Sequence, residues 1–333
     1  MNAAVDIIVL NWNGAADTVR CVNKLIQQTF PYRSILVIDN GSVDDSPRAL
    51  KHLEDHDRVN LLLLPTNLGF VGGCNLAMQK SFNSGADYVW LFNNDAIPEP
   101  DALDQLVMAA ELDSRIGLLS PLILEAEDHS LVQMGCGLLD LSQPGYQLTY
   151  DVGQVQAWQR DFPDRIILHG TALLVRRSLY QAIGGFDDRF FAYWEDVDYS
   201  IRSSQAGYQN LSLLDTYVYH GSKDTRSTPD LIKPHYFYFY TRNEILTWSK
   251  YCKGRRYLRI LLWVLVHQLK QIARMPGNVP GIDAITAGLW HGWFGIGGRF
   301  DPKSRMPNPF RFLLRRFPGV WLEVLGEAKP RLT

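Results

Sequence analysis

Short apolar runs alternate with amphipathic stretches along the first 120 residues, and this alternation constrains the fold more than any other feature of the sequence. The apolar runs are Val5–Leu10, Ile35–Ile38, Leu61–Leu64, Tyr88–Phe92 and Ile116–Leu119. Helical periodicity falls between them, near Thr18–Gln28, Ser46–His56, Gly73–Ser84 and Asp101–Leu112. Strands that alternate with crossover helices form a mostly parallel sheet with helices on both faces. We therefore predict an α/β fold with a mostly parallel, Rossmann-like sheet.

A second ordered block is expected further along the chain, after a stretch at 121–168 that is expected to be irregular with possible short strands. In this block we predict a strand over Thr171–Val175, a helix over Tyr193–Ser204 and a run from Tyr208 that leads to His220. From about Leu231 the composition shifts toward long helices rich in aromatic residues and arginine. We predict two domains, residues 1–228 and a C-terminal helical appendage over 229–333.

Each of four expected strands is followed directly by Asn or Asp side chains. The segments are Asn11-Trp12-Asn13-Gly14, Asp39-Asn40-Gly41-Ser42, Asn67-Leu68-Gly69 and Asn93-Asn94-Asp95. A single Asn or Asp after a strand is ordinary turn chemistry. Ligands of open α/β sheets, however, bind beyond the carboxyl ends of the strands. Four such segments at one edge therefore favour a nucleotide-type site over plain turns.

Asp95 and His220 are candidate metal ligands. The carboxylate of Asp95 follows an apolar strand, where it can hold a hard divalent cation that in turn binds diphosphate oxygens. His220 follows the aromatic run Tyr217–Tyr219, and imidazole together with carboxylate suits Mn²⁺ or Mg²⁺. The alternative is a turn aspartate and a structural histidine, and on spacing alone that alternative is the more frequent outcome for His220.

Three carboxylates stand together in Glu195-Asp196-Val197-Asp198, at the start of an expected helix. A helix dipole favours acidic side chains in its first turn, and Arg202 is correctly spaced to pair with Asp198. The functional alternative is a general base, because a carboxylate beside a hydrophobic wall can accept the proton of an attacking alcohol. Clustered like charges also raise at least one pKa, which favours that role.

Several other site classes lack their sequence signatures. The segment Gly69–Gly73 is rich in glycine but is not G-x-G-x-x-G, and no P-loop motif occurs. Phosphate binding is therefore expected to rest on metal and backbone. The four cysteines are far apart and contain no C-x-x-C pair, which argues against a zinc site or a disulfide framework. With no secretory signal recognisable, we expect a cytoplasmic protein.

Six segments in a fixed order resemble the family 2 glycosyltransferases, which have the glycosyltransferase A fold. They read V-D-I-I-V-L-N-W-N-G, V-I-D-N-G-S-V-D-D-S, N-L-G-F-V-G-G-C-N, F-N-N-D-A, G-G-F-D-D-R-F-F and W-E-D-V-D-Y-S-I-R. The resemblance spans roughly residues 4–225. The N-N-D-A and E-D-V-D-Y-S-I-R segments are most similar to rhamnosyltransferase-like enzymes of bacterial cell-surface polysaccharide biosynthesis, such as those of the O-antigen and cell wall.

The resemblance implies a donor that is a sugar linked to dTDP or UDP, a divalent metal (Mn²⁺ or Mg²⁺), inversion at the anomeric carbon and a saccharide or lipid-linked acceptor. By position it assigns the donor site to Asn11, Asn13, Asp39, Asn67, Gly69, Gly72, Asn93 and Asn94. It assigns the metal to Asp95 and His220, the general base to Asp196 with Glu195 as the less favoured candidate, and the acceptor to Gly185, Phe186 and Trp194.

One position departs from the family pattern. The first aspartate of the family's D-x-D motif is Asn93 in this sequence. An amide oxygen is a neutral and weaker ligand than a carboxylate. We therefore expect the metal to enter mainly with the diphosphate of the donor.

Charge is distributed unevenly along the chain. Residues 251–333 hold 14 Lys and Arg against 4 Asp and Glu, whereas the first 250 residues hold 19 against 31. An acidic body with a basic, aromatic tail suggests an anionic partner for the tail, either a membrane face or nucleic acid. No nucleic-acid-binding motif is present and the body is acidic, so we expect no nucleic acid partner.

The tail contains an apolar stretch, Tyr257–Leu269, that is too short to span a membrane, because a span needs about 20 residues. Basic side chains flank it and Trp263 lies within it, which fits a helix lying in the membrane interface at the inner face of the cell membrane. A helical appendage packed on the catalytic domain is an equally good interpretation. The same basic and aromatic mixture recurs at Trp290, Trp293, Phe294, Phe310, Arg311, Phe312, Arg315, Arg316 and Trp321.

Two other functions compete with glycosyl transfer. A nucleotidyltransferase on a related sheet usually carries a glycine-rich loop with a basic residue after its first strand, and Asn11–Gly14 offers none. A catalytically weak or inactive scaffold that binds nucleotide-sugars is suggested by Asn93. The retention of Asp95, the Glu195-Asp196 pair and His220 argues against such a loss of activity.

Overall fold

The computed structural model describes residues 3–140, 145–221, 233–275 and 277–301, together with residues 311, 312, 314 and 316. The chain divides into two compact units, which are described separately. The first contains residues 1–139, 146–187 and 195–222, and the second contains residues 140–145, 188–194 and 223–333. The expected boundary at residue 228 lies outside the described residues, as do Phe310, Arg315 and Trp321.

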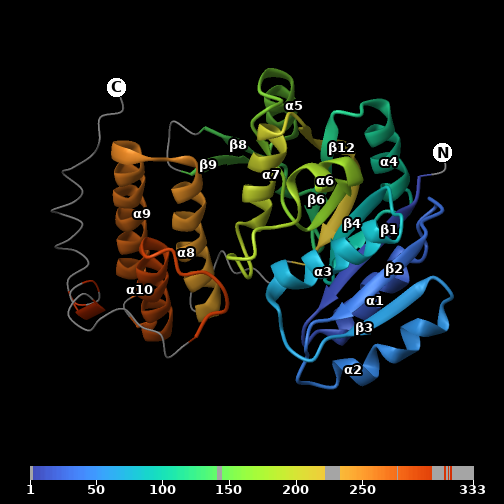
Figure 1. Ribbon diagram of the computed structural model, residues 1–333, viewed down its shortest axis with the longest axis horizontal. Helices are drawn as coiled ribbons and strands as arrows, with labels where there is room; N and C mark the ends of the chain where they lie inside the picture. Colours follow the sequence, from blue (N-terminus) through green and yellow to red (C-terminus); the bar gives the residue numbers. More distant parts are fainter. Residues whose placement is uncertain are drawn as a thin grey trace. The chain divides into compact units, whose positions relative to one another are not determined.

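A large sheet forms the centre of the first unit (Figure 1), with the strand order β3-β2-β1-β4-β11-β6-β12-β5 and β7 paired to β6. The strands are β1 (Val5–Asn11), β2 (Ser34–Asp39), β3 (Val59–Leu63), β4 (Tyr88–Asn93), β5 (Ala96–Pro98), β6 (Ile116–Glu125), β7 (Val132–Met134), β11 (Ala172–Arg176) and β12 (Gln209–His220). Strands β1 to β4 are parallel, and β11 is antiparallel to both β4 and β6. The predicted α/β fold is confirmed.

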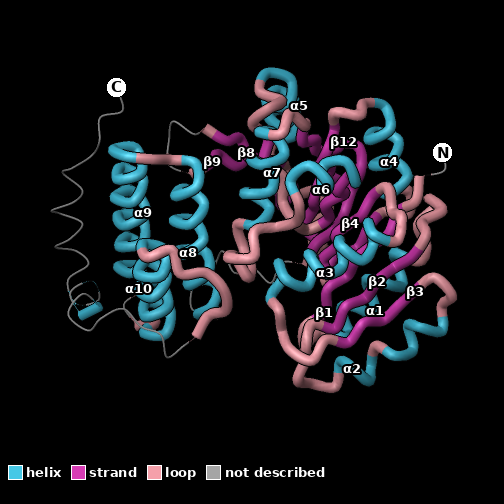
Figure 2. The backbone as a smooth tube through the Cα atoms, in the orientation of Figure 1, coloured by secondary structure: helices cyan, strands magenta, loops and turns pink. Residues whose placement is uncertain are grey.

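Helices cover both faces of this sheet, as the cyan and magenta layers of Figure 2 show. On one face, α1 (Ala15–Leu25) and α4 (Ala102–Leu112) share a core with Val5, Ile7 and Val9 of β1. On the other face lies α3 (Gly69–Asn83), where Gly73 permits close approach because a Cβ there would lie 2.5 Å from Leu10. Burial on both faces explains why β1 contains the unbroken apolar run Ile7–Leu10.

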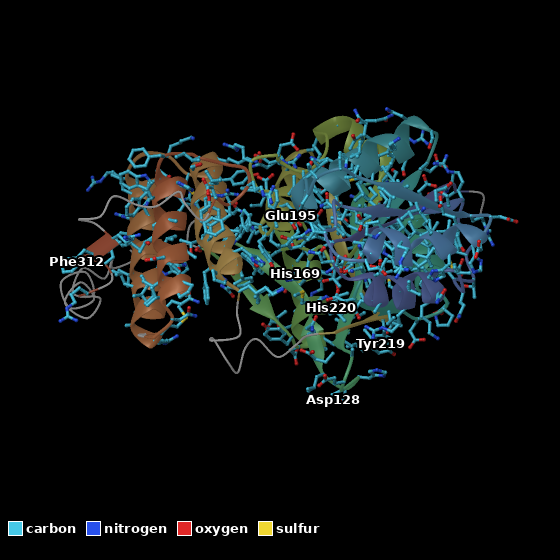
Figure 3. The ribbon with its side chains drawn as sticks, turned by 90° about the horizontal axis from the view of Figure 1, so that it is seen from below. Asp128, His169, Glu195, Tyr219, His220 and Phe312 are labelled. Atoms are coloured by element: carbon cyan, nitrogen blue, oxygen red, sulfur yellow. The ribbon has the colours of Figure 1, made fainter. Side chains whose placement is uncertain are left out.

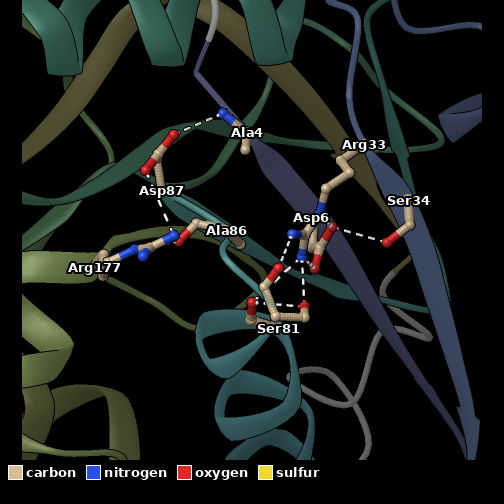
Figure 4. A network of polar contacts seen from close by, with 9 residues as sticks. Ala4, Asp6, Arg33, Ser34, Ser81, Ala86, Asp87 and Arg177 are labelled. Carbon is tan, nitrogen blue, oxygen red and sulfur yellow. Dashed lines mark hydrogen bonds and ion pairs between the residues drawn. The ribbon is translucent and has the colours of Figure 1, made fainter.

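The amino ends of the strands carry a polar network on the edge opposite to the Asn and Asp segments (Figure 4). Asp6 is buried, forms an ion pair with Arg33, and accepts a hydrogen bond of 2.8 Å from the hydroxyl of Ser34. Arg33 also donates to the hydroxyl of Ser84 over 2.8 Å. Asp87 accepts from the amide of Ala4 over 2.9 Å. This network links β1, β2 and the end of α3, and Arg33 neutralises the buried carboxylate of Asp6.

The segment 121–168 was expected to be irregular with possible short strands, and the structure contains such strands together with the continuation of β6 and one helix. Strand β6 continues through Pro121 to Glu125, and β8 (Cys136–Leu139) pairs with β9 (Tyr146–Thr149) and β10 (Ile166–Ile167) in a small second sheet. Helix α5 (Val152–Asp161) follows β9. Strands of two to four residues are too short to give a visible alternation, so the pattern carried no signal there.

Two expected helices of the first unit have other bounds than predicted, and a further helix, which follows β11, was not predicted. The stretch from Ser46 forms only α2 (Ser46–Ala49), followed by the 3₁₀ helix η1 (Lys51–Asp55). Helix α6 (Arg177–Ile183) follows β11, and α7 (Glu195–Gln205) begins at the first acid of its segment. The position of Glu195 and Asp196 in the first turn of α7 is therefore as predicted from the sequence.

The described part of the second unit is helical, as predicted for the C-terminal region. It contains α8 (Pro234–Tyr251), α9 (Gly254–Arg274) and α10 (Val279–Trp293). Helix α10 approaches α8 closely because Gly288 lacks a side chain, and a Cβ there would lie 2.7 Å from the carbonyl of Tyr238. Among the described residues, no helix is both long and apolar enough to cross a membrane.

Candidate active site

The ends of β1 and β2 bring Asn11 and Asp39 side by side, since these residues are register partners. The carboxylate of Asp39 is buried and accepts from the amide of Asn11 over 2.7 Å and from the hydroxyl of Ser42 over 2.6 Å. The backbone amide of Ser42 donates to its second oxygen over 3.1 Å. Three donors therefore fix the carboxylate at the carboxyl edge of the sheet.

Asn11 itself is turned inward. Its side-chain oxygen accepts from Thr18 over 2.8 Å, and the hydroxyl of Thr18 in turn accepts from the amide of Asn94 over 3.0 Å. Asn13 has a positive φ of 53°, and its side-chain oxygen accepts from the amide of Val43 over 2.9 Å. These three asparagines thus shape the loops at the strand ends, while Trp12 between them is half exposed.

Asn67, Gly69 and Gly72 surround the start of α3. The side chain of Asn67 accepts from the amide of Gly69 over 2.7 Å, and Asn40 donates to the carbonyl of Gly69 over 2.9 Å. Gly69 has a positive φ of 79°, which a residue with a Cβ adopts only with strain. A Cβ at Gly72 would lie 2.9 Å from Leu68. The glycines therefore allow the tight backbone at the start of α3, where Gly69 is buried and Leu68 is exposed.

Asp95 and His220 meet next to the end of β4. His220 is the last residue of β12 and pairs with Ala96 of β5, so its ring lies beside Asp95. The distance from Nε2 of His220 to Oδ1 of Asp95 is 3.1 Å, and Nδ2 of Asn93 lies 3.4 Å from the same nitrogen. Burial would raise the pKa of Asp95, but the hydrogen bond and charge of His220 lower it below its ordinary value.

Gln133 determines which nitrogen of His220 carries the proton. Its amide nitrogen donates to Glu125 over 3.1 Å, which turns its oxygen toward Nδ1 of His220 at 2.6 Å. Nδ1 therefore carries a proton, which it donates to Gln133, and Nε2 faces the carboxylate of Asp95. Nε2 and a carboxylate oxygen this close together require a proton or a cation between them.

This donor set fits a divalent cation. It offers one carboxylate, one imidazole with a fixed tautomer and the side chain of Asn93. Within the described ranges, no group of three His, Cys, Asp or Glu side chains is arranged to hold a metal ion. The remaining ligands would have to come from a bound diphosphate. This agrees with the expectation that Asn93 is a weaker metal ligand than an aspartate would be.

The three acids at the start of α7 have different environments. Asp198 is fully buried and pairs with Arg202 over 2.8 Å, the structural role expected from its spacing. Glu195 is also buried. The side chain of Asp196 is 17% exposed, and its Oδ2 accepts from the amide of Gly170 over 3.0 Å. Asp196 therefore combines partial exposure with a fixed orientation.

His169 lies beside Asp196, with 3.9 Å between its Nδ1 and Oδ2 of the aspartate (Figure 3 labels His169 and Glu195). Burial lowers the pKa of His169, and the charge of Asp196 opposes that shift. Its Nε2 has no hydrogen-bond partner in the part of the chain that the structure describes. A neutral imidazole is therefore present next to Asp196.

The expected acceptor residues are well packed. Phe186 is buried and contacts Tyr199 edge to face at 5.0 Å, while Asn75 bonds both the amide and the carbonyl of Phe186. A Cβ on Gly185 would lie 2.4 Å from the side chain of Asn75, which explains the glycine. Trp194 belongs to the second unit, where it contacts Trp248 and Tyr240.

Several residues of this region were not identified from the sequence. Ser42 and Thr18 could have been found, because they lie in or next to the strand-end segments. Gln133 belongs to the segment expected to be irregular, and His169 and Gly170 directly follow that segment. Since β11 is antiparallel to β4, its amino end lies at the carboxyl edge of the sheet, and this brings His169 and Gly170 to the site.

Comparison with known proteins identifies the family. The sequence model described as Glycosyl transferase family 2 matches residues 6–184, which is more than half of the chain. The chain belongs to glycosyl transferase family 2. The resemblance predicted from the six sequence segments is thereby confirmed.

Relatives and solved structures agree with this assignment. The chain is 29% identical over 238 residues to N-acetylglucosaminyl-diphospho-decaprenol L-rhamnosyltransferase of Mycobacterium tuberculosis, covering 66% of this chain and 76% of that protein. The mannosyltransferase PcManGT from Pyrobaculum calidifontis, solved with GDP-Man and Mn²⁺, has a TM-score of 0.55 at 17% identity, covering 98% and 85% of the two chains. TarS 1–349 of S. aureus, solved with UDP, has a TM-score of 0.55 at 14% identity, covering 98% and 90%. The glycosyltransferase A type of fold is confirmed.

Proposed function

We propose that this family 2 glycosyltransferase is metal-dependent and inverting. It would move a sugar, with rhamnose as the favoured candidate, from a dTDP- or UDP-linked donor to a saccharide or lipid-linked saccharide. The observation that carries the proposal is the Asp95–His220 pair at the carboxyl edge of the sheet, with a carboxylate oxygen and an imidazole nitrogen 3.1 Å apart. The rhamnosyltransferase relative supports the choice of sugar, because it is 29% identical.

In the proposed mechanism, Asp95 and His220 would hold the divalent cation, which supplies Lewis-acid stabilisation of the departing nucleoside diphosphate. Asp39, with its carboxylate fixed by Asn11 and Ser42, would accept a hydrogen bond from the pyrimidine ring of the donor. The backbone of the Gly69–Gly73 turn would lie along the ribose and diphosphate. None of these roles requires a P-loop.

Asp196 would be the general base. The acceptor hydroxyl gives its proton to Asp196 while its oxygen forms a bond to the anomeric carbon, and the bond from that carbon to the diphosphate oxygen breaks on the opposite face. The hydrogen bond from Gly170 orients the carboxylate, and its partial exposure leaves it open to an acceptor. Glu195 is the less favoured base, because it is more deeply buried.

The test is a donor-hydrolysis screen. Purified protein is incubated with Mn²⁺ or Mg²⁺ and a panel of nucleotide-sugars that includes dTDP-rhamnose, and release of nucleoside diphosphate is measured. We expect slow, metal-dependent release from one donor. Asp196→Asn should reduce turnover by about 10²–10⁴-fold while the affinity for the nucleoside diphosphate stays unchanged. The exposed Asp45→Asn serves as a matched control.

Two results would change the proposal. Normal turnover in Asp196→Asn would move the base to Glu195. Binding of a nucleoside diphosphate by calorimetry, with no release from any donor even when acceptor is supplied, would favour the alternative of a catalytically inactive nucleotide-sugar-binding scaffold.

We further propose that α9 binds an anionic membrane surface at the inner face of the membrane, where a lipid-linked acceptor would be found. The helix contains no acidic residue, and Leu258 and Trp263 are 64% and 37% exposed. Its exposed cations are Arg255, Arg256, Arg259, Lys270 and Arg274. Apolar side chains among cations on one helix are typical of interfacial binding.

Vesicle flotation tests this second proposal. The protein should float at low salt with vesicles that contain phosphatidylglycerol and should not float with phosphatidylcholine alone. The double variant Arg256→Glu with Lys270→Glu should reduce flotation at least about tenfold, as expected for an electrostatic contribution of about 1 kcal/mol per cation. If the wild-type protein stays at the bottom of the gradient with both vesicles, α9 is not a membrane anchor.

A further inference from the structure

Residues 188–194, here called the entry loop, lead into α7 with an unusual backbone. Phe191, Tyr193 and Trp194 have φ values of 51°, 68° and 71°, which place three non-glycine residues in the left-handed region. Bulky residues rarely adopt this region. Such a conformation persists only where the surrounding structure holds it in place. The entry loop therefore needs contacts that determine its backbone.

Arg242 of α8 supplies one set of these contacts. Its guanidinium is fully buried and donates to the carbonyls of Arg189, Phe190 and Gly298 over 3.1, 3.5 and 2.5 Å. Among the described residues, its partners are carbonyls, the hydroxyl of Tyr238 and the side chain of Asn243, with no carboxylate. The guanidinium therefore acts as a fixed set of donors for backbone oxygens.

Asn243, the next residue of α8, supplies the second set. Its amide nitrogen donates to the carbonyls of Ala192 and Tyr193, each over 2.7 Å. Its oxygen accepts from Nε of Arg242 over 2.8 Å, so each side chain holds the other in place. Together the two side chains bond four of the seven carbonyls of the entry loop.

Aromatic packing accompanies these hydrogen bonds. Phe191 stacks on Phe239 with ring centroids 5.2 Å apart. Tyr193 meets Tyr236 edge to face at 5.1 Å, and Trp194 contacts Tyr240 and Trp248 at 5.7 and 6.3 Å. All three strained residues thus pack their side chains on α8.

The chain passes from Trp194 directly into Glu195 and Asp196, the first two residues of α7. We propose that Arg242 and Asn243 are positioning residues, which hold the entry loop in its strained conformation and thereby fix the place of the carboxylate at the start of α7. The proposal rests on the proposed function for the role of that carboxylate. In this proposal, two residues of the helical C-terminal unit act as positioning residues for catalysis.

Two variants and one control test the proposal. Asn243→Asp keeps the shape and the acceptor for Arg242 but replaces the donor to Ala192 and Tyr193 with an oxygen. Arg242→Lys keeps the charge but loses the fork of donors. Thr247→Val is the control, because Thr247 is buried on the same helix and its hydroxyl has no partner in the described part of the chain.

The first readout is hydrogen exchange of the full-length protein, measured by mass spectrometry on peptides that cover residues 188–194. We expect exchange to become faster by about tenfold or more in both variants, which corresponds to about 1.4 kcal/mol, and to stay unchanged in Thr247→Val. Peptides from β1 and β4 should exchange as in the wild type. Unchanged exchange in the entry loop would contradict the proposal that Arg242 and Asn243 hold this loop in its conformation.

The second readout is donor turnover together with the affinity for UDP or dTDP. We expect turnover to fall at least about tenfold while nucleotide affinity stays within twofold of the wild type. Faster exchange with normal turnover would overturn the positioning role. If the wild-type protein releases no nucleoside diphosphate from any donor, the proposed function fails. The exchange experiment still decides whether Arg242 and Asn243 hold the entry loop.

Discussion

Replacement of Gln133 by leucine is the sharpest test of the proposed metal site. The substitution removes the acceptor that lies 2.6 Å from Nδ1 of His220, and it leaves Asp95 and His220 themselves unchanged. Gln133 is anchored at its other end by Glu125, so the native contact is held firmly. Without it, nothing bonded to Nδ1 in the described region selects the tautomer whose Nε2 lone pair points at Asp95.

The magnitude follows from the contact that is lost. A half-buried N–H that loses its acceptor costs about 1–3 kcal/mol. Since 1.4 kcal/mol is a factor of ten, this cost corresponds to roughly 10–100-fold in affinity for a cation at Nε2. Residues that orient a ligating histidine from behind typically contribute the same amount.

The assay is titration of Mn²⁺ by calorimetry or by electron paramagnetic resonance, in the presence of UDP or dTDP because the diphosphate is expected to complete the site. A second readout is nitrogen NMR of His220, which reports the tautomer without any metal. Gln159→Leu is the matched control, because Gln159 also bonds β12, at Ser212, with distances of 2.6 and 3.2 Å.

We expect Gln133→Leu to bind Mn²⁺ about 10–100-fold more weakly and to lose the fixed tautomer, and Gln159→Leu to do neither. Equal affinity in Gln133→Leu and the wild type would refute the argument that Gln133 prepares His220. An equal loss in both variants would mean that any damage to β12 disturbs the site, which would also refute it.

Two further predictions concern stability. Gly41→Ala should lower the free energy of unfolding by about 2 kcal/mol or more in urea titrations, because φ is 67° and the new Cβ would lie 2.4 Å from the backbone of Thr66. Gly184→Ala is the control. Its φ is 72° and the space around it is open, so it measures the cost of the positive φ alone. Burial raises the pKa of Glu244 to about 8, so the folded state keeps a proton that the unfolded state loses, and stability should fall by up to about 1.4 kcal/mol per pH unit as the pH rises from about 4.5 to 8. Glu244→Gln should abolish this decline, and a wild-type melting temperature that does not change over that pH range would contradict it.

The sequence predicted the first half of the fold well, for a physical reason. Strands β1, β2 and β4 are buried on both faces, so each contains an unbroken apolar run, and the parallel order places Asn11, Asp39 and Asn93 at one edge. The direction of each side chain could not be predicted in the same way. The sequence did not reveal that the side chain of Asn11 bonds Asp39 and Thr18, because these bonds depend on how the neighbouring loops fold.

The residues missed around the site share one cause. His169, Gly170 and Gln133 lie in or next to strands of two to five residues, and antiparallel pairing carries them to the edge where the parallel strands end. Neither the pairing nor its register leaves a local pattern in the sequence. The predicted tail segment Tyr257–Leu269 likewise understated its helix, because α9 extends through basic residues on both sides to a length of 21 residues.

The first turn of α7 illustrates how the fold distinguishes three similar acids. The helix dipole favours negative charge at all three positions, so the sequence pattern alone does not separate them. The fold separates them by environment, since Asp198 is neutralised by Arg202 and Glu195 is buried, whereas Asp196 is held by Gly170 and remains partly open. A base must reach its substrate and keep one orientation, and of these three acids only Asp196 combines the two. The strained entry loop leads directly into this helix, and its proposed role is to hold the carboxylate of Asp196 in place.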